Sequence, residues 1–196
     1  MTIDILNHLP DKYRQAAAET YYEAFRRKLH PIMRDDRKAI AALAADFDAE
    51  RAIVALVDGE FAGIAGIKHD GRQLANLTWA TMRQQFGIWG ALWRFALLAL
   101  LERKQEKGVL LMDGIAVRPE MRGKGVGTQL LEAVYAYARE AGFDAVRLDV
   151  VDTNPRARQL YERRGFIAEK TASYPFLQRV MGFSAVTTMT RPVNAQ

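Results

Sequence analysis

The stretch Arg122-Gly123-Lys124-Gly125-Val126-Gly127-Thr128 joins an apolar strand to a helix. Residues 110–117 before it are mostly apolar and end at Arg118-Pro119, which predicts a strand that stops at a proline. After it, Gly142 stands where a C-terminal cap is expected, and apolar residues recur at helical spacing, namely Val126, Leu130, Val134 and Ala138. The sequence therefore predicts a strand, a glycine turn and a helix in direct succession.

The glycines of this turn suit an anion-binding site. A turn with glycines at positions 123, 125 and 127 presents successive backbone N–H groups at a helix N-terminus, where the helix dipole also favours an anion such as phosphate. Glycine serves equally in any tight turn between a strand and a helix. The turn alone therefore leaves both interpretations open.

Two familiar phosphate motifs differ from this turn in their spacing. A P-loop needs Gly-x-x-x-x-Gly-Lys followed by Ser or Thr, whereas Lys124 is followed by Gly125. A dinucleotide fingerprint needs Gly-x-Gly-x-x-Gly, whereas this turn has Gly-x-Gly-x-Gly. Asp149 does lie near the place where that fingerprint would have a ribose-binding acid. A nicotinamide dinucleotide site therefore stays an alternative, although the repeated strand–helix units that it needs are missing.

A second short motif follows the apolar run 145–151. Asn154 is a suitable N-cap for a helix that begins with Pro155, and Tyr161 lies on the same helical face, together with Ala157 and Arg158. An amide and a phenol therefore face the same way beside the glycine turn. An ordinary capped helix with a half-buried tyrosine is the structural alternative.

Length and composition limit the classes of protein. A chain of 196 residues is expected to form one domain, residues 1–196, with its own core. The absence of cysteine excludes disulfides, thiolate metal ligands and a cysteine nucleophile, and we expect no metal site. Residues 1–8 lack the basic start and apolar run of an export signal, which favours a cytoplasmic location.

Charge and hydropathy bear on the partners. The net charge of +5 comes from dispersed basic residues, which favours a small anionic ligand over a nucleic-acid backbone. The most apolar segment, residues 86–101, is interrupted by Arg94 and is shorter than the roughly 20 residues of a membrane span. We therefore expect neither nucleic acid nor a membrane as a partner. The segment 86–101 is expected to form a buried or interface helix.

The other expected elements are read from periodicity and turn signals. A strand is expected at 3–6, helices from Pro10-Asp11 to about Leu29 and from Asp35-Asp36 to about Phe47, and a break between them at His30-Pro31. Asp58-Gly59 predicts a hairpin of the runs 51–57 and 60–67. Residues 76–106 are helical in composition with a break near Gly87 or Gly90, and 166–174 and 184–191 are expected as strands joined by an aromatic and apolar loop.

The two motifs together resemble the GNAT superfamily of N-acetyltransferases. The residues that carry the resemblance are Val117-Arg118-Pro119-Glu120-Met121-Arg122-Gly123-Lys124-Gly125-Val126-Gly127 and Asn154-x-x-Ala157-x-x-Leu160-Tyr161-x-x-x-Gly165-Phe166. The resemblance implies a mixed α/β (α+β) fold, in which helices flank a strongly twisted mixed sheet of about six to seven strands. It also implies acetyl-CoA as cosubstrate, held between two splayed strands, here 110–117 and 145–151.

The resemblance assigns the cosubstrate contacts residue by residue. The CoA pyrophosphate would rest on the backbone amides of Arg122, Gly123, Lys124, Gly125, Val126, Gly127 and Thr128. The pantetheine arm would pair like an extra strand with Ile115, Ala116 and Val117, and a backbone N–H near Ile115 or Ala116 would hold the thioester oxygen. Asn154 would bind the pantetheine or its phosphate end.

The resemblance also implies direct transfer of the acetyl group to an amine in a ternary complex, which agrees with the absence of cysteine. Tyr161 matches the tyrosine that protonates the departing thiolate in many members. Asp149 and Asp113 are two candidates for the base, and either is alternatively structural. His8, His30 and His69 are interpreted as solvated side chains of loops or element ends.

The acceptor is expected to be a primary amine of a small molecule or peptide. In the family it enters beside the first two helices and the last loop, here about 21–36 and 174–183. The segment 76–106 is longer than the family pattern requires, so it either caps the site or forms a homodimer contact. A domain that binds acyl-CoA as a sensor, without catalysis, is the alternative function.

Overall fold

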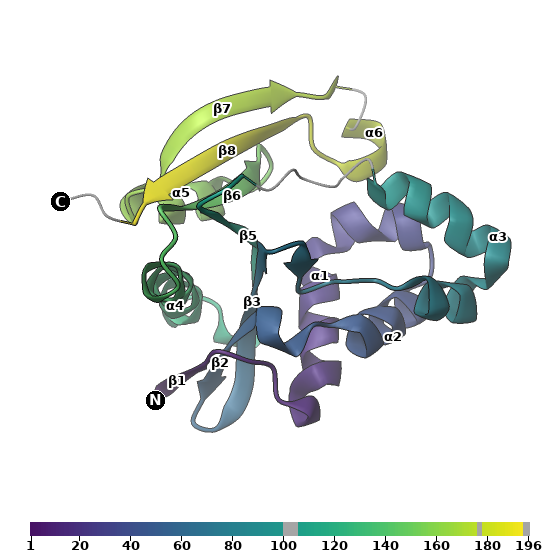
Figure 1. Cartoon of the computed structure of the whole chain (residues 1–196), viewed down its shortest axis with the longest axis horizontal. Coiled ribbons are helices and arrows are strands. Elements are labelled where there is room, and N and C mark those ends of the chain that lie inside the picture. Colours follow the sequence, from purple (N-terminus) through teal and green to yellow (C-terminus); the bar gives the residue numbers. More distant parts are fainter. Residues whose placement is uncertain (100–105, 176–177, 194–196) are drawn as a thin grey trace.

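The computed structural model describes residues 1–99, 106–175 and 178–193, and its centre is one mixed sheet. The strands lie in the order β1-β2-β3-β5-β6-β8-β7, with β4 beside β3 (Figure 1). Their bounds are β1 Ile3–Leu6, β2 Ala52–Val57, β3 Glu60–His69, β4 Arg72–Gln73, β5 Val109–Val117, β6 Ala145–Val151, β7 Ile167–Ser173 and β8 Ala185–Pro192. The expected mixed α/β fold is confirmed, and the additional short strand is β4, whose two residues are too few to show a pattern.

The first part of the sheet is an antiparallel meander. Strands β2 and β3 form the predicted hairpin, and its turn has positive φ angles at Asp58 (50°) and Gly59 (84°). Strand β1 pairs with the other edge of β2, and β3 pairs antiparallel with β5. This part of the sheet therefore holds β5 firmly on one side.

The predicted divergence of two strands is confirmed at β5 and β6. These parallel strands pair only at their beginnings, where Val109, Leu110 and Leu111 lie opposite Ala145, Val146 and Arg147. Beyond that point β5 continues against β3, and β6 continues against β8 along its whole length. The sheet therefore opens between the C-terminal halves of β5 and β6.

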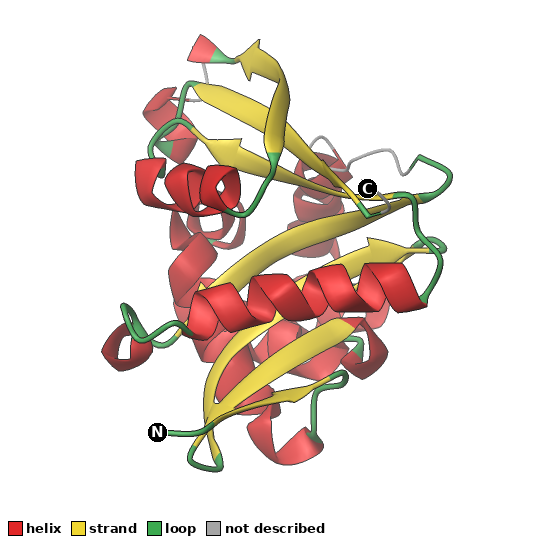
Figure 2. Cartoon of the chain, turned by 90° about the vertical axis from the view of Figure 1, so that its left-hand side faces the viewer, coloured by secondary structure: helices red, strands yellow, loops and turns green. Residues whose placement is uncertain are grey.

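Helices cover both faces of the sheet. Helices α1 (Arg14–Met33), α2 (Asp36–Asp46) and α3 (Trp79–Ala99) lie on one face, and α4 (Val126–Glu140) and α5 (Pro155–Arg163) on the other (Figure 1). Figure 2 shows α4 running across its face of the sheet. Two apolar cores result, which we call the α1-side core, with Tyr21, Leu43 and Phe61, and the α4-side core, with Leu110, Leu130 and Leu148.

Two expectations for the first helix were wrong. The helix does not break at His30-Pro31; it continues to Met33, and Arg34 ends it with a φ of 59°. Burial of Ile32 and Met33 in the core offsets the hydrogen bond that Pro31 cannot donate. The helix also begins later than expected, because Asp11 lies in a short 3-10 turn, Asp11–Tyr13, and pairs with Arg14, the first residue of α1.

The second and third helices follow the sequence more closely. Asp35 caps α2 by accepting a hydrogen bond from the backbone N–H of Lys38, as its residue type predicts. Helix α3 is broken at Gly87, whose φ is 71°, which is one of the two expected positions. Residues 100–105 of the expected helical segment lie outside the described residues.

The last loop contains a short helix, α6 (Gln178–Met181), which sequence periodicity did not predict. Residues 176–177 of the same loop lie outside the described ranges. The predicted helix–turn order around α4 and α5 is confirmed, including Asn154 as N-cap and Pro155 as first residue of α5. The opening between β5 and β6 thus has α4 and α5 on one face of the sheet and α1 on the other.

Candidate active site

The free edge of β5 is the first component of the site. Among the described strands, only β3 pairs with β5 beyond Leu111, so the backbone groups of β5 that point away from β3 face the opening. Ile115, Ala116 and Val117 pair with Ala65, Ile64 and Gly63 of β3. All three predicted contact residues of the pantetheine arm therefore lie on a strand that can accept one more extended partner.

A bulge bends β5 where the opening starts. Met112 lies opposite Ile67 and Gly114 opposite Gly66, so Asp113 is an extra residue without a partner position on β3. Gly114 has a φ of 154°, and a Cβ atom on it would overlap the Phe25 ring of α1. The bulge therefore needs glycine at 114 and turns Asp113 away from the regular pleat.

The glycine turn is the second component. It follows a short 3-10 turn, Pro119–Met121, and has positive φ angles at Gly123 (77°) and Gly125 (86°). Gly125 is the N-cap of α4 and provides no side-chain hydrogen bond to the helix start. Residues 122–125 are exposed, whereas the Val126 side chain is fully buried in the α4-side core. The first N–H groups of a 15-residue helix are thus presented at the surface without a side-chain cap, which suits an anion.

Helix α5 supplies the third component. The Asn154 Oδ1 atom accepts a hydrogen bond of 3.2 Å from the N–H of Ala157, so its side-chain amide keeps its N–H donors for another partner. The Tyr161 side chain is buried against Phe166, with 5.9 Å between the ring centroids. Among the described residues, none forms a hydrogen bond with the Tyr161 hydroxyl.

Burial raises the pKa of the Tyr161 hydroxyl. Desolvation disfavours the phenolate and raises the pKa of Tyr161 to about 12. The hydroxyl therefore stays protonated at neutral pH and can act as a proton donor, but it cannot act as a base there. An ordinary tyrosine is protonated at neutral pH as well, and a raised pKa makes the hydroxyl a weaker acid, so the predicted role toward a departing thiolate rests on the place of Tyr161 and not on this shift.

The two candidate bases lie on the opposite face of the sheet from Tyr161. Asp149 alternates along β6 with Leu148 and Val150, which belong to the α4-side core, so its carboxylate faces the other side. There it accepts a hydrogen bond of 2.8 Å from Thr188 of β8. Asp113 faces the same α1 side and lines a cavity there. A group held in the opening between β5 and β6 would therefore have Tyr161 on one side and both carboxylates on the other.

The cavity beside Asp113 has a volume of about 270 Å³ and lies between the sheet and helices α1, α2 and α3. Its walls combine apolar and polar side chains. The apolar ones include Leu29, Leu43, Leu77, Phe95 and Leu98, and the polar ones are Tyr21, Lys28, Lys68, Gln73, Asn76 and Asp113. We call this the helix-side cavity.

Sequence patterns did not single out either lysine of this cavity. Lys28 belongs to the basic run 26–28, whose positive charge stabilises the C-terminal end of a helix. This explanation gave no reason to expect Lys28 at a cavity. Lys68 follows directly on the predicted strand 60–67 and extends it, and only 6% of its surface is exposed. A charged residue at the end of an apolar strand was the available signal, but its burial depends on helices that come from other parts of the chain.

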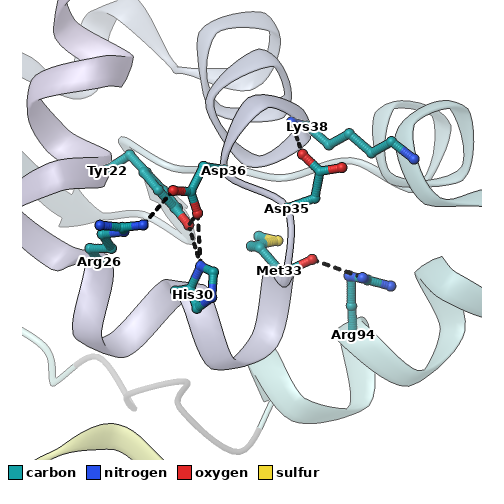
Figure 3. A network of polar contacts seen from close by, with 8 residues as sticks. All are labelled: Tyr22, Arg26, His30, Met33, Asp35, Asp36, Lys38 and Arg94. Carbon is teal, nitrogen blue, oxygen red and sulfur yellow. Dashed lines mark hydrogen bonds and ion pairs between the residues drawn. The ribbon is translucent and has the colours of Figure 1, made fainter.

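The junction between α1 and α2 is fixed by a polar network (Figure 3). The Asp36 carboxylate accepts hydrogen bonds from the Tyr22 hydroxyl and from Arg26, each at 2.7 Å, and lies 2.7 Å from His30 Nδ1. These contacts lower the pKa of Asp36, with the Tyr22 hydrogen bond as the largest cause. On the other side of the junction, Arg94 of α3 donates a 2.8 Å hydrogen bond to the carbonyl of Met33. The network orients the part of α1 that carries Lys28 and Leu29.

The interpretation of all three histidines as solvated was wrong for His69. This side chain is 7% exposed and lies 2.8 Å from both Asp70 and the Tyr137 hydroxyl of α4. It belongs to β3, which extends two residues beyond its predicted end, so the ring is covered by α4. None of the three histidines lines the helix-side cavity or lies in the glycine turn.

Neither a membrane-spanning helix nor a cluster of metal ligands occurs in the described ranges. None of the helices there combines the length and the apolar character that crossing a membrane requires. Within the same residues, the histidine, aspartate and glutamate side chains form no cluster of three or more that could hold a metal ion.

Comparison with known sequences agrees with the two motifs. The model of the Acetyltransferase (GNAT) family matches residues 11–166. Mycothiol acetyltransferase of Propionibacterium freudenreichii is 42% identical over 57 residues, which are 29% of this chain and 18% of that protein. Thialysine N-epsilon-acetyltransferase of Bos taurus is 38% identical over 56 residues, which are 29% of this chain and 33% of that protein. The matched segments thus span a third or less of these two relatives.

Comparison with solved structures shows that the fold is shared. A structure described as an acetyltransferase has a TM-score of 0.65 and 23% identity, and the match covers 97% of this chain and 100% of that chain. A putative acetyltransferase from Salmonella typhimurium, solved with its cofactor acetyl-CoA, has a TM-score of 0.62 and 15% identity over 100% of this chain and 96% of that chain.

Proposed function

Because the chain belongs to the GNAT family of acetyltransferases, we propose that it transfers the acetyl group of acetyl-CoA directly to the primary amine of a small molecule or peptide. The observation that carries the proposal is the uncapped start of α4 beside the opening between β5 and β6. An anion site and a free strand edge at one place suit a cosubstrate that has a pyrophosphate and an amide-containing arm.

Most contacts to the cosubstrate would come from backbone groups. The amides of residues 122–128 would hold the pyrophosphate, and Lys124 and Arg122 would add positive charge beside it. The pantetheine amides would pair with Ile115, Ala116 and Val117 along the free edge of β5, and Asn154 would donate its side-chain N–H groups to the arm. The side chains of Ile115 and Val117 pack against the α4-side core, which is compatible with a role of their backbone only.

The proposed reaction breaks one bond and forms another. The neutral amine nitrogen attacks the thioester carbonyl carbon, and a backbone N–H near Ile115 or Ala116 stabilises the negative charge on the oxygen of the tetrahedral intermediate. Collapse of this intermediate breaks the C–S bond and leaves the acetamide. The thiolate takes a proton from the Tyr161 hydroxyl, which is protonated at neutral pH.

The proton of the attacking amine needs a base on the α1 side. Asp113 is our first choice, because it lines the helix-side cavity in which an acceptor would lie. Asp149 is the second choice, because its carboxylate already accepts a hydrogen bond from Thr188. Direct transfer in a ternary complex remains the proposed order, since the chain has no cysteine to form an acyl-enzyme.

A homodimer contact through α3 is a separate part of the proposal. Large apolar side chains of this helix are exposed, among them Ile88 (58%), Trp89 (80%) and Leu92 (53%). Light scattering after size-exclusion chromatography measures the mass directly. We expect a dimer that Trp89→Lys converts to a monomer, and a wild-type monomer at all concentrations would contradict this part alone.

Two other functions predict different results in one experiment. Release of free thiol from acetyl-CoA is measured with a panel of amines and peptides, and acetyl-CoA binding is measured by calorimetry in parallel. The proposed acetyltransferase binds acetyl-CoA and releases thiol only when an accepted amine is present. A sensor domain binds acetyl-CoA without release by any amine, and a nicotinamide enzyme binds NAD in preference to acetyl-CoA.

A further inference from the structure

Arg94, in the second half of α3, is a buried arginine whose surface is 8% exposed. Its guanidinium lies over two aromatic rings, 4.0 Å from the centroid of Phe86 and 4.2 Å from that of Trp93. Among the residues that the structure describes, no carboxylate forms an ion pair with it. Desolvation by burial lowers the pKa of Arg94, and the positive charge of Arg34 lowers it further. A buried cation of this kind is costly, and an apolar side chain of similar size would fill the space without that cost.

The guanidinium makes two directed contacts that an apolar side chain cannot make. Arg94 donates a 2.9 Å hydrogen bond to the carbonyl of Gly90 in its own helix. It donates a second one, of 2.8 Å, to the carbonyl of Met33, the last residue of α1 (Figure 3). The last carbonyls of a helix have no N–H partner within the helix and carry a partial negative charge. Arg94 thus places a positive charge from α3 at the C-terminal end of α1.

The last turn of α1 needs such support from outside the helix. Pro31 has no N–H group to bond this turn to the preceding one. The Asp36 carboxylate holds one side of the junction through its contacts with Tyr22, Arg26 and His30, and Arg94 holds the other side (Figure 3). The end of α1 is therefore fixed by one contact from α2 and one from α3.

The break at Gly87 divides α3 into two halves that are anchored separately. At the start of the helix, the backbone N–H of Thr78 and the hydroxyl of Thr81 bind the carboxylate of Asp46, the last residue of α2, at 2.6 Å and 2.7 Å. Gly87 has a φ of 71°, so the direction of the second half depends on tertiary contacts and not on a continuous helix. The bond from Arg94 to Met33 is such a contact.

The two helices that Arg94 joins both line the helix-side cavity. Leu29 of α1 lies four residues before Met33, and Phe95 and Leu98 of α3 follow Arg94 by one and four residues. All three cavity residues are thus within about one helical turn of the Arg94–Met33 bond. The position of this bond therefore sets the spacing between the α1 wall and the α3 wall of the cavity.

We propose that Arg94 is a positioning residue for the acceptor: it binds the Met33 carbonyl and thereby holds α1 and the second half of α3 at the spacing at which the helix-side cavity accepts the amine. This inference rests on the proposed acetyltransferase function and adds a residue that determines acceptor binding. Arg94 is not part of the cavity lining, so it acts through Leu29, Phe95 and Leu98. The glycine turn and α5 lie on the other face of the sheet, so binding of acetyl-CoA does not depend on it.

The test is two-substrate kinetics with Arg94→Met, and calorimetry gives the affinity for acetyl-CoA in parallel. The acceptors are hexylamine, phenylethylamine, spermidine, leucinamide and trialanine, and the comparison uses the one that releases most thiol with the wild type. We expect the KM for this amine to rise about tenfold, because a displaced wall binds it less well. Both kcat and the affinity for acetyl-CoA should stay within about threefold. An unchanged amine KM, or a loss carried by kcat or by acetyl-CoA affinity instead, would overturn the inference.

Arg14→Met is the matched control. Arg14 donates hydrogen bonds of 3.1 Å and 2.8 Å to the carbonyls of Ala44 and Phe47 at the C-terminal end of α2, and it does not line the cavity. This variant removes the same kind of contact at a helix end, so it should lower the melting temperature and leave the amine KM within about twofold. If Arg14→Met raises the amine KM as much as Arg94→Met does, a general loss of stability explains both and the inference is wrong.

Arg94→Lys tests the contact with a conservative change. Lysine keeps the charge, but its single ammonium group does not reproduce the planar fork that binds two carbonyls. We expect an amine KM about threefold above the wild type, between the values of the wild type and Arg94→Met. If Arg94→Met does not fold, this variant carries the kinetic test, and an amine KM equal to that of the wild type then contradicts the inference.

Hydrogen exchange measures the structural part of the inference without any acceptor. In Arg94→Met, or in Arg94→Lys if the methionine variant does not fold, residues 29–34 and 88–99 should exchange faster than in the wild type, and in Arg14→Met they should not. Unchanged exchange in both segments would show that Arg94 does not hold them.

Failure of the inference and failure of the proposed function give different results. If an amine of the panel releases thiol and its KM does not respond to Arg94, only the inference is wrong. If acetyl-CoA does not bind to the wild type, or none of the five amines releases thiol above the rate without amine, the proposed function fails and the inference fails with it.

Discussion

The glycine turn at the start of α4 and the helix-side cavity lie on opposite faces of one sheet, and they are built in different ways. The turn comes from seven consecutive residues, 122–128, and it presents backbone N–H groups. The cavity is lined from α1, α2, α3, β3 and β5, and it presents side chains. A backbone site is thus encoded by local spacing, whereas a side-chain site depends on contacts between distant segments.

The largest effect is expected from Gly125→Val. Gly125 has a φ of 86°, and a β-branched residue at such a φ costs about 1–3 kcal/mol or changes the turn. Because the turn would hold the pyrophosphate, we expect acetyl-CoA affinity in calorimetry to fall by about 100-fold or more. Gly59→Val is the matched control: Gly59 has a φ of 84° in open space at the β2–β3 hairpin, so that variant loses stability but keeps its affinity. Equal affinities of both variants would remove the turn from the cosubstrate site.

Tyr161→Phe should mainly affect the chemical step. We expect kcat to fall by about 100-fold while the affinity for acetyl-CoA stays within about threefold, because an acid acts in the transition state. Stability should change little, since no described residue bonds to this hydroxyl. Tyr135→Phe is the control, because it removes the hydrogen bonds from the Tyr135 hydroxyl to the carbonyls of Pro192 and Val193. We expect this variant to be about 1 kcal/mol less stable and fully active. An unchanged kcat in Tyr161→Phe would show that another group protonates the thiolate.

A comparison of Asp113→Asn with Asp149→Asn sharpens the role of the α1 side. If Asp113 is the base, its replacement lowers kcat/KM by about 10- to 100-fold near neutral pH. Asp149→Asn keeps an oxygen for Thr188 and should change the rate by less than about threefold. The reverse order of the two effects would assign the base to Asp149.

The smallest expected effect concerns the junction that orients α1. Asp36 has a pKa below its ordinary 3.8, so its contribution to stability is present above that pH and is lost as pH falls through the folded-state pKa. Asp36→Asn should therefore lower the melting temperature at neutral pH, and the difference from the wild type should disappear in acid. Asp35→Asn is the control, because asparagine caps helices as well as aspartate does. A difference that persists unchanged well below pH 3.8 would show that Asp36 acts through its shape and not through its charge.

The same contrast explains how much the sequence revealed. The hairpin at Asp58-Gly59, the break at Gly87 and the cap at Asn154 follow from local rules, and the structure confirms them. The break expected at Pro31 failed because buried residues beyond it extend the helix. Periodicity within one segment cannot report such tertiary contacts.

In the candidate site, too, some features follow from local sequence and others depend on contacts between distant segments. The glycine turn and the Asn154–Tyr161 spacing could be predicted because each is a local pattern, and the opening beside β5 was expected from the family resemblance. Burial of Lys68 and His69 could not, because it is set by α4 on one face and by α1 to α3 on the other. The cosubstrate was therefore predictable from sequence, whereas the helix-side cavity became visible only when α1, α2 and α3 were packed against the sheet.

A two-substrate kinetic experiment tests the central claim most directly. Initial rates of thiol release are measured while acetyl-CoA and an accepted amine are varied together. We expect double-reciprocal lines that intersect, because both substrates must be bound when the amine attacks the thioester. Parallel lines, which indicate an acetylated enzyme, or acetyl-CoA binding without thiol release by any amine, would contradict it.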